Sequence, residues 1–173
     1  LAGRPGMGKT SLATNIAFST ALRYKLDQRD GISPTSGAPV ALFSLEMSSD
    51  QLANRILAEQ SRISSENLRM GKINQAEFNE LARAAEELYD LPLYIDDTPA
   101  LSTAAMRARA RRLKRQKKIG LIVVDYLQLL KDSSRASEAN RVQEVSEITQ
   151  GLKSIAKELN IPVIGLLQLS RQV

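Results

Sequence analysis

Residues 3–10 read Gly-Arg-Pro-Gly-Met-Gly-Lys-Thr, which matches the G-x-x-x-x-G-K-T pattern of a phosphate-binding loop. Glycines let several backbone N–H groups converge on a phosphate, with the N-terminus of a helix behind them. We expect Lys9 to reach the β- and γ-phosphates of a nucleotide and the Thr10 hydroxyl to bind Mg²⁺. The alternative is a glycine-rich turn with an incidental lysine. The expected nucleotide-binding residues are Gly3, Arg4, Pro5, Gly6, Met7, Gly8, Lys9, Thr10 and Ser11.

Three polar residues, Glu46, Asp125 and Gln168, each follow a largely apolar run of the kind that forms a buried parallel strand. Because ligands bind at the carboxyl ends of such strands, these side chains are expected near the phosphate-binding loop. Asp125 would hold the Mg²⁺ water shell beside Thr10, and Glu46 would orient or deprotonate an attacking water. Gln168 would hydrogen-bond the γ-phosphate and sense whether it is present.

Each of these residues also has a purely structural interpretation. Asp125 could cap a turn or a helix, and Glu46 could be a solvated residue favoured by a helix dipole. Gln168 could be a loop residue with no role. Their joint occurrence after a phosphate-binding loop favours the site.

The elements that must position these residues alternate between helical periodicity and short apolar runs. Helices are predicted at 9–24, from Ser48 or Ser49 onward, at about 75–89, from Ser102 to about 117 and at 140–159, with strands at 40–45, 93–95, 121–124 and 162–167 and a polar loop at 25–39. The helix at 75–89 is expected to turn inward Phe78, Leu81, Ala82, Ala85 and Leu88. This alternation indicates an α/β fold with a parallel sheet.

Composition narrows the class of protein. The 173 residues are enough for one domain, and 43% hydrophobic with 25% charged residues is ordinary for a globular protein. The absence of Cys and His excludes disulfides, the usual zinc sites and Ser-His or Cys-His catalysis. No apolar run approaches membrane-spanning length and no signal peptide is visible, so we expect a cytoplasmic protein with no membrane partner. Only two residues precede the loop, which predicts a piece cut from a larger chain at both ends.

Two basic segments are candidates for binding nucleic acid, which the net charge of +5 permits. The predicted helix around 107–118 is rich in Arg and Lys, but its apolar stripe favours a solvated outer face over direct DNA contact. The polar loop at 131–141 is the better candidate, with Arg135, Asn140 and Arg141 as potential phosphate contacts. Its alternative is a disordered surface loop.

Taken together, the motifs resemble the C-terminal ATPase domain of DnaB-type replicative helicases of bacteria, their phages or plasmids. The resemblance is carried by residues 3–11, by Phe43-Ser-Leu-Glu-Met-Ser48, by Ile122-Val-Val-Asp-Tyr-Leu-Gln-Leu129 and by Gln168-Leu-Ser-Arg171. The spacing agrees across essentially the whole chain. Leu167 departs from a serine that is common just before the glutamine, but the hydrogen-bonding group itself is kept.

The resemblance implies a RecA-like P-loop NTPase core, with a mainly parallel sheet flanked by helices on both faces, as a single domain over residues 1–173. By position, Lys9, Glu46 and Gln168 would be catalytic, and Thr10 and Asp125 would hold Mg²⁺. The implied cofactors are ATP and Mg²⁺. The arginine finger and the later DNA-contacting loop of the family lie outside this sequence.

The implied activity is that of a ring of six subunits which hydrolyses ATP, translocates on single-stranded DNA and unwinds duplex DNA. The resemblance also allows contacts with a primase and a helicase loader through regions outside this sequence. Two alternatives remain open at this point: a RecA-fold recombinase or repair ATPase, and a nucleotide-dependent switch that binds DNA without unwinding it.

Overall fold

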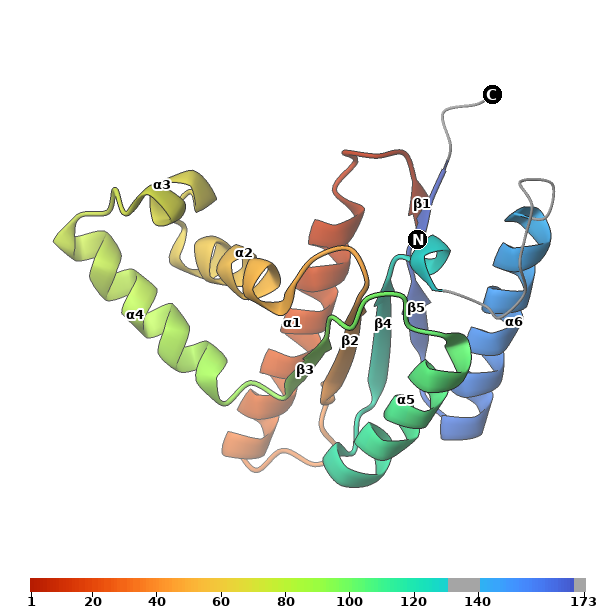
Figure 1. Ribbon diagram of the computed structural model, residues 1–173. Coiled ribbons are helices and arrows are strands. Elements are labelled where there is room, and N and C mark those ends of the chain that lie inside the picture. The colour runs from red at the N-terminus through yellow and green to blue at the C-terminus, as the bar shows by residue number, and fades with distance from the viewer. Residues whose placement is uncertain (131–140, 170–173) are drawn as a thin grey trace.

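A computed structural model describes residues 1–130 and 141–169 of the chain, as parallel strands covered by helices (Figure 1). The helices are α1 (Lys9–Arg29), α2 (Ser49–Ser61), α3 (Ser65–Met70), α4 (Gln75–Tyr89), α5 (Thr103–Lys117) and α6 (Arg141–Leu159). The strands are β1 (Ala2–Gly3), β2 (Val40–Ser44), β3 (Leu93–Asp96), β4 (Leu121–Asp125), β5 (Val163–Gly165) and β6 (Leu167–Gln168), and a 3₁₀ turn, η1 (Leu127–Leu129), follows β4. None of the described helices is both long and apolar enough to cross a membrane.

All strand pairs are parallel. Four strands lie in the order β3-β2-β4-β5, and a short ladder joins β1 to β6. Only Leu166 separates β5 from β6, and its N–H donates to the carbonyl of Val124 at 2.9 Å. The carbonyl of Leu166 accepts from the N–H of Leu127, also at 2.9 Å. The chain of β5 and β6 therefore connects β4 to β1, so that the phosphate-binding loop begins beside the end of the main sheet.

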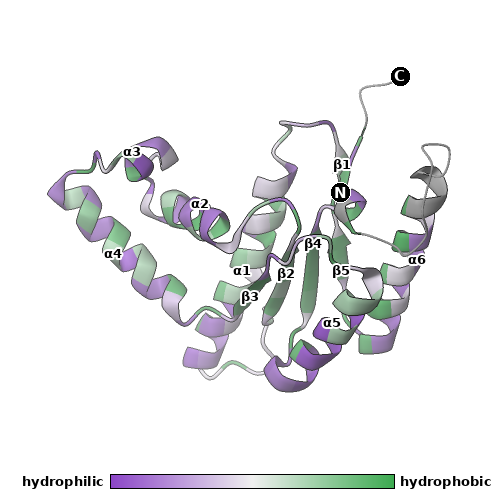
Figure 2. Ribbon diagram, in the orientation of Figure 1, coloured by the Kyte–Doolittle hydropathy of each residue, from purple (hydrophilic) through white to green (hydrophobic). Residues whose placement is uncertain are grey.

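Alternate side chains of the central strands enter two different cores. Val40 and Leu42 of β2 pack with α1 and α2, whereas Ala41 and Phe43 pack with α5 and α6. In Figure 2 the apolar strands lie between these helices, whose polar residues face outward. The predicted α/β fold, with a parallel sheet flanked by helices on both faces, is confirmed.

Several elements differ from the prediction. Helix α1 continues to Arg29 because Asp27, buried in its last turns, pairs with Arg23 at 3.0 Å and accepts a hydrogen bond from the N–H of Ser36 at 2.6 Å. Helix α3 was not predicted, since its six residues are too few to show a periodicity. The run at 162–167 is two strands, because the chain changes its bonding partner from β4 to β1 at Leu166.

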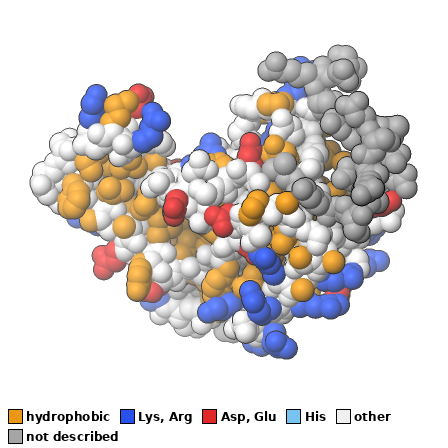
Figure 3. All heavy atoms as spheres, viewed as in Figure 1, with side chains coloured by type: hydrophobic (Ala, Val, Ile, Leu, Met, Phe, Trp, Pro, Cys, Tyr) orange, Lys and Arg blue, Asp and Glu red, His pale blue; other side chains and the backbone are white. Residues whose placement is uncertain are grey.

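The prediction for the inward face of α4 is mostly wrong. Leu81 and Leu88 are partly buried, but Phe78 is 54% exposed, and the buried residue is Ala84. Ala82 and Ala85 are exposed as well. The reason is that α4 packs mainly on α2, on a lobe that stands away from the sheet (Figure 1). Figure 3 shows hydrophobic side chains gathered on the surface of this lobe.

Replacing Asp96, at the end of β3, should destabilise the fold in a pH-dependent way. Arg109 of α5 donates to both carboxylate oxygens at 2.7 and 2.6 Å, and also to the hydroxyl of Thr98 at 2.6 Å. Burial opposes ionisation, yet the hydrogen bonds from Arg109 and Thr98 hold the pKa of Asp96 below its ordinary value. Asp96→Asn should therefore lower the free energy of unfolding near neutral pH by about 1–2 kcal/mol.

The sign follows from linkage. A carboxylate with a lower pKa in the folded state stabilises the protein above its unfolded pKa of about 3.9, and this contribution is lost as the pH falls through the folded value. Urea unfolding should show the wild-type and Asp96→Asn curves converging towards low pH. A difference that stays constant across the pH range would show that the Asp96 charge contributes nothing.

Candidate nucleotide site

The phosphate-binding loop has the backbone that an anion site needs. Gly6 and Gly8 have φ angles of +76° and +78°, which side-chain-bearing residues rarely adopt. Gly8 is the N-cap of α1, where no side chain caps the helix and no acidic residue lies in the first turn. By contrast, the N-termini of α2, α3, α4 and α5 are capped by Ser48, Ser64, Asn74 and Ser102. The first N–H groups of α1 are thus left available for a phosphate.

Lys9 lies across this loop. Its ammonium group donates to the carbonyl of Arg4 at 2.7 Å, so the cation is held over the turn rather than extended into solvent. Arg4 and Met7 are exposed, whereas Thr10 and Ser11 are partly buried in the first turn of α1. The nine residues predicted to bind nucleotide therefore run from the last residue of β1 through the loop into the first turn of α1.

Asp125, the last residue of β4, is buried beside the loop. It pairs in register with Ser44, the last residue of β2, and is 2% exposed. Burial raises the pKa of Asp125, against the opposing effects of the Thr10 hydroxyl and the cations of Arg55 and Lys9. Although Thr10 lies beside it, neither carboxylate oxygen accepts a hydrogen bond of normal geometry from a described residue.

A buried carboxylate without partners is costly, and a cation would compensate it. Mg²⁺ commonly takes one or two carboxylates together with substrate phosphates, so a single Asp beside a Thr hydroxyl fits it. No cluster of three acidic side chains that could hold a metal without a nucleotide occurs among the described residues. The donor set at Thr10 and Asp125 is therefore suited to a metal that arrives with a nucleotide.

Glu46 lies in the loop between β2 and α2, and this loop is tied to β4. The N–H of Leu45 donates to the carbonyl of Asp125 at 2.7 Å. The buried Ser44 hydroxyl donates to the carbonyl of Met47 at 2.6 Å, and the N–H of Met47 returns a bond to that hydroxyl at 3.3 Å. Glu46 itself is exposed. These bonds fix the backbone on both sides of a carboxylate that remains free to contact a ligand.

Glu46 and Asp125 act on the same neighbour. Burial raises the pKa of the Tyr126 phenol, and the negative charges of Glu46 and Asp125 raise it further. Both negative charges therefore act on the Tyr126 phenol, in line with the backbone bond that ties the Glu46 loop to Asp125.

Gln168 borders the start of the phosphate-binding loop. It pairs in register with Gly3, and the N–H of the next residue, Leu169, donates to the carbonyl of Gly3 at 3.1 Å. The structure thus brings together the three strand-end residues and the loop at one edge of the sheet. Whether these residues bind a nucleotide stays a prediction.

Arg55 of α2 also lies near Asp125, and the sequence analysis did not single it out. It is half-buried, its charge acts on Asp125, and its guanidinium approaches the sulfur of Met47 at 3.7 Å. Arg55 forms no ion pair with any residue that the structure describes. The sequence could have indicated Arg55, because it lies on the same face of α2 as the buried Leu52 and Ile56. A cation on a buried helix face needs a partner or a ligand.

The structure gives no side-chain position for the three candidate DNA-binding residues. Arg135 and Asn140 lie outside the described residues, and Arg141 begins α6 without a described side chain. In α5, Arg107 pairs with Glu158 of α6 at 3.3 Å, and Arg111 pairs with the same carboxylate. These α5 cations therefore join two helices on the outside of the molecule, as the solvated-face interpretation expects.

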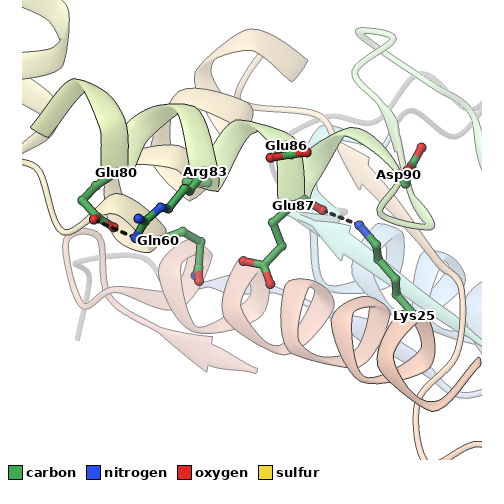
Figure 4. Close-up of a pocket in the computed structure, with 8 residues that line it drawn as sticks. Lys25, Gln60, Glu80, Arg83, Glu86, Glu87 and Asp90 are labelled. Atoms are coloured by element: carbon green, nitrogen blue, oxygen red, sulfur yellow. Dashed lines mark hydrogen bonds and ion pairs between the residues drawn. The ribbon is translucent and has the colours of Figure 1, made fainter. Parts of the chain in front are cut away.

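A hollow of about 560 Å³ lies between α1, α2 and α4 (Figure 4). Its two cations are already engaged, because Lys25 donates to the carbonyl of Glu87 at 3.0 Å and Arg83 pairs with Glu80 at 3.1 Å. Glu86 and Asp90 add further negative charge. This hollow is away from the strand ends and is unsuited to a triphosphate.

The chain matches known proteins over its whole length. The model of the DnaB-like helicase C terminal domain matches residues 1–173. The replicative DNA helicase DnaB of Rickettsia bellii is 53% identical over all of this chain, and that of Nostoc sp. is 46% identical. The chain spans 34% and 18% of the lengths of these two proteins.

Solved structures agree with this match. One of them, described as an ATPase domain, superposes with a TM-score of 0.80 at 30% identity, over 99% of this chain and 56% of that one. A DnaB-like replicative helicase, whose structure is described with its interactions with primase, superposes with a TM-score of 0.78 at 29% identity, over 99% of this chain and 38% of that one. The resemblance inferred from the motifs is confirmed, and the chain belongs to the family of the DnaB-like helicase C terminal domain.

Proposed function

We propose that this chain is the ATP-hydrolysing motor domain of a hexameric replicative DNA helicase that translocates on single-stranded DNA and unwinds duplex DNA. The observation that carries the proposal is the convergence of the glycine loop, Glu46, Asp125 and Gln168 at one edge of the sheet. A helix N-terminus for the phosphates, a Thr and an Asp for Mg²⁺, and a carboxylate that can orient water are parts that enzymes use for phosphoryl transfer.

Each residue has a distinct role in this proposal. The amides of residues 6–10 and the Lys9 ammonium hold the β- and γ-phosphates of ATP, while Thr10 and Asp125 hold Mg²⁺. Mg²⁺ held by Thr10 and Asp125 would supply positive charge against the charge that develops on the phosphates. Glu46 accepts the proton of the attacking water, and its exposed position leaves room for that water.

Two further side chains respond to the γ-phosphate. Arg55 supplies a positive charge next to Asp125 and is placed to stabilise the phosphoryl group in transit. Gln168 hydrogen-bonds the γ-phosphate, so that hydrolysis removes a contact at the end of β6. Because β6 leads directly into the C-terminal residues of this chain, loss of that contact is a way to move the segments that bind DNA.

The proposal extends to the whole protein, of which this chain is one domain. Six copies form a ring in the cytoplasm, each with ATP and Mg²⁺ at a subunit interface where a neighbour supplies an arginine. Single-stranded DNA passes through the centre, and a primase and a helicase loader bind through other domains. Relatives named replicative DNA helicase DnaB and a structural neighbour described with primase support this assignment.

A strand-displacement assay on the full-length protein tests the proposal. With ATP and Mg²⁺, it should release a labelled strand from a forked duplex, with turnover stimulated by single-stranded DNA. A recombinase or repair ATPase would pair or coat strands without displacing them. A nucleotide-dependent switch would bind DNA in an ATP-dependent manner without DNA-stimulated turnover. Either result would contradict a helicase.

Reversing the charge of Arg135 and Arg141 should weaken DNA binding. Changing both to Glu in the full-length protein replaces two cations with two anions in the segment that follows Asp125 in the sequence. We expect the affinity for single-stranded DNA to fall by about tenfold or more at moderate salt, with a smaller salt dependence and unchanged ATP affinity. A salt titration in which slope and affinity both match the wild type would exclude these residues.

A further inference from the structure

Gln168 is held along one edge by β1. The N–H groups of its two neighbours, Leu167 and Leu169, donate to the carbonyls of Leu1 at 2.8 Å and Gly3 at 3.1 Å. In an extended strand, the N–H and C=O of the residue between them point towards the opposite edge. The backbone polar groups of Gln168 therefore face away from β1 and need partners of their own.

Among the residues that the structure describes, no strand reaches that opposite edge at this level, because β4 ends at Asp125. The partner is instead the side chain of Gln128 in η1. Its amide nitrogen donates to the carbonyl of Gln168 at 2.5 Å, and its amide oxygen accepts from the N–H of Gln168 at 3.2 Å. A carboxamide offers one donor and one acceptor in a plane, as a peptide group does. Gln128 thus replaces the missing strand for a single residue.

We propose that Gln128 is a positioning residue that fixes the backbone of Gln168 and so aims its side chain at the γ-phosphate. With both edges bonded, the backbone dihedrals of Gln168 are set by β1 on one side and by Gln128 on the other. We call these two hydrogen bonds between the Gln128 side chain and the Gln168 backbone the clasp. Gln128 also lies three residues after Asp125, so the clasp joins the proposed metal-binding strand end to the proposed γ-phosphate contact. The inference rests on the role proposed for Gln168.

Two substitutions in the full-length protein separate the parts of the clasp. Gln128→Glu removes the donor and sets a carboxylate oxygen against the carbonyl of Gln168. Gln128→Met removes both groups at similar length, and it provides the test if the Glu variant does not fold. Gln150→Glu, on the exposed surface of α6, is a control with the same change of charge.

The first readout is structural and independent of catalysis. Exchange of the backbone amide hydrogen of Gln168 should be faster by about tenfold or more in Gln128→Met, because its acceptor is lost. Unchanged exchange at this amide would overturn the inference, whatever the effect on activity.

The second readout is kinetic. We expect kcat for DNA-stimulated ATP hydrolysis to fall by about 10- to 100-fold, as for a misplaced contact, with KM for ATP and the affinity for ADP unchanged. Gln150→Glu should match the wild type. In a double-mutant cycle with Gln168→Ala, the Gln128 substitutions should add no further loss.

The outcomes distinguish two failures. If Gln168→Ala itself leaves DNA-stimulated turnover intact, the proposed role of Gln168 is wrong, although faster exchange would still establish the clasp. If Gln168→Ala is impaired while the Gln128 variants turn over normally, or if the two losses simply add, Gln128 does not position Gln168.

Discussion

Changing Glu46 to glutamine should reduce ATP hydrolysis by about 10³-fold while ATP still binds. The substitution keeps size and hydrogen bonding but removes the group that accepts a proton from water. Because Glu46 is exposed and its loop is anchored through Ser44 and Leu45, neither the loop nor the fold depends on its charge. Single-turnover hydrolysis and nucleotide binding should be measured on the full-length protein.

A matched control for this prediction is Glu66→Gln, an exposed glutamate in the first turn of α3. It changes the same charge by the same chemistry on a helix away from the strand ends. The control should turn over at the wild-type rate. Near-normal hydrolysis by Glu46→Gln would mean that another group activates the water.

Changing Asp125 to asparagine should have opposite effects on stability and on activity. Without a ligand, Asp125 is a buried acid with a raised pKa and no hydrogen-bond partner among the described residues. Removing its charge should increase the free energy of unfolding of the ligand-free protein by about 1 kcal/mol. The same change removes a ligand of Mg²⁺, so hydrolysis should fall by about 10²-fold or more.

Thermal unfolding with and without Mg²⁺ and a nonhydrolysable ATP analogue separates these effects. The wild type should gain more stability from the two ligands together than Asp125→Asn does, because binding to the folded state is linked to stability. A suitable control is Asp50→Asn, since Asp50 is an exposed acid in the first turn of α2. If Asp125→Asn is less stable than the wild type without ligands and keeps full activity, Asp125 has a structural role only.

The positions of the candidate site residues were predictable from sequence to the extent that they depend on strand ends. Asp125 and Glu46 follow apolar runs whose burial on both sides leaves a parallel strand as the fitting interpretation, and parallel strands end at a common edge. The glycine spacing also predicted the phosphate-binding loop, because the loop backbone has positive φ angles at Gly6 and Gly8, which favour glycine. The proximity of the loop, Glu46 and Asp125 therefore follows from local sequence patterns together with the rule that parallel strands end at a common edge.

The residues that the sequence did not reveal depend on contacts between distant segments. Arg55 acts on Asp125 across the interface of α2 with the strand ends, and Gln128 bonds a residue 40 positions away. The amphipathic pattern of α4 predicted a buried face, yet Phe78 is exposed, because periodicity tells which side of a helix is apolar and not whether this chain covers it. Such features require knowledge of the tertiary arrangement.

The central claim is that the loop at residues 3–11, Asp125 and Gln168 form one binding site for ATP and its metal. Crystals of the full-length protein with Mn²⁺ and a nonhydrolysable ATP analogue test it, since Mn²⁺ replaces Mg²⁺ and scatters anomalously. We expect one anomalous peak per subunit, about 2 Å from the Thr10 hydroxyl and next to Asp125, with the γ-phosphate between Lys9 and Gln168. A peak elsewhere, such as the hollow at Glu87, or a triphosphate turned away from Glu46 would contradict it.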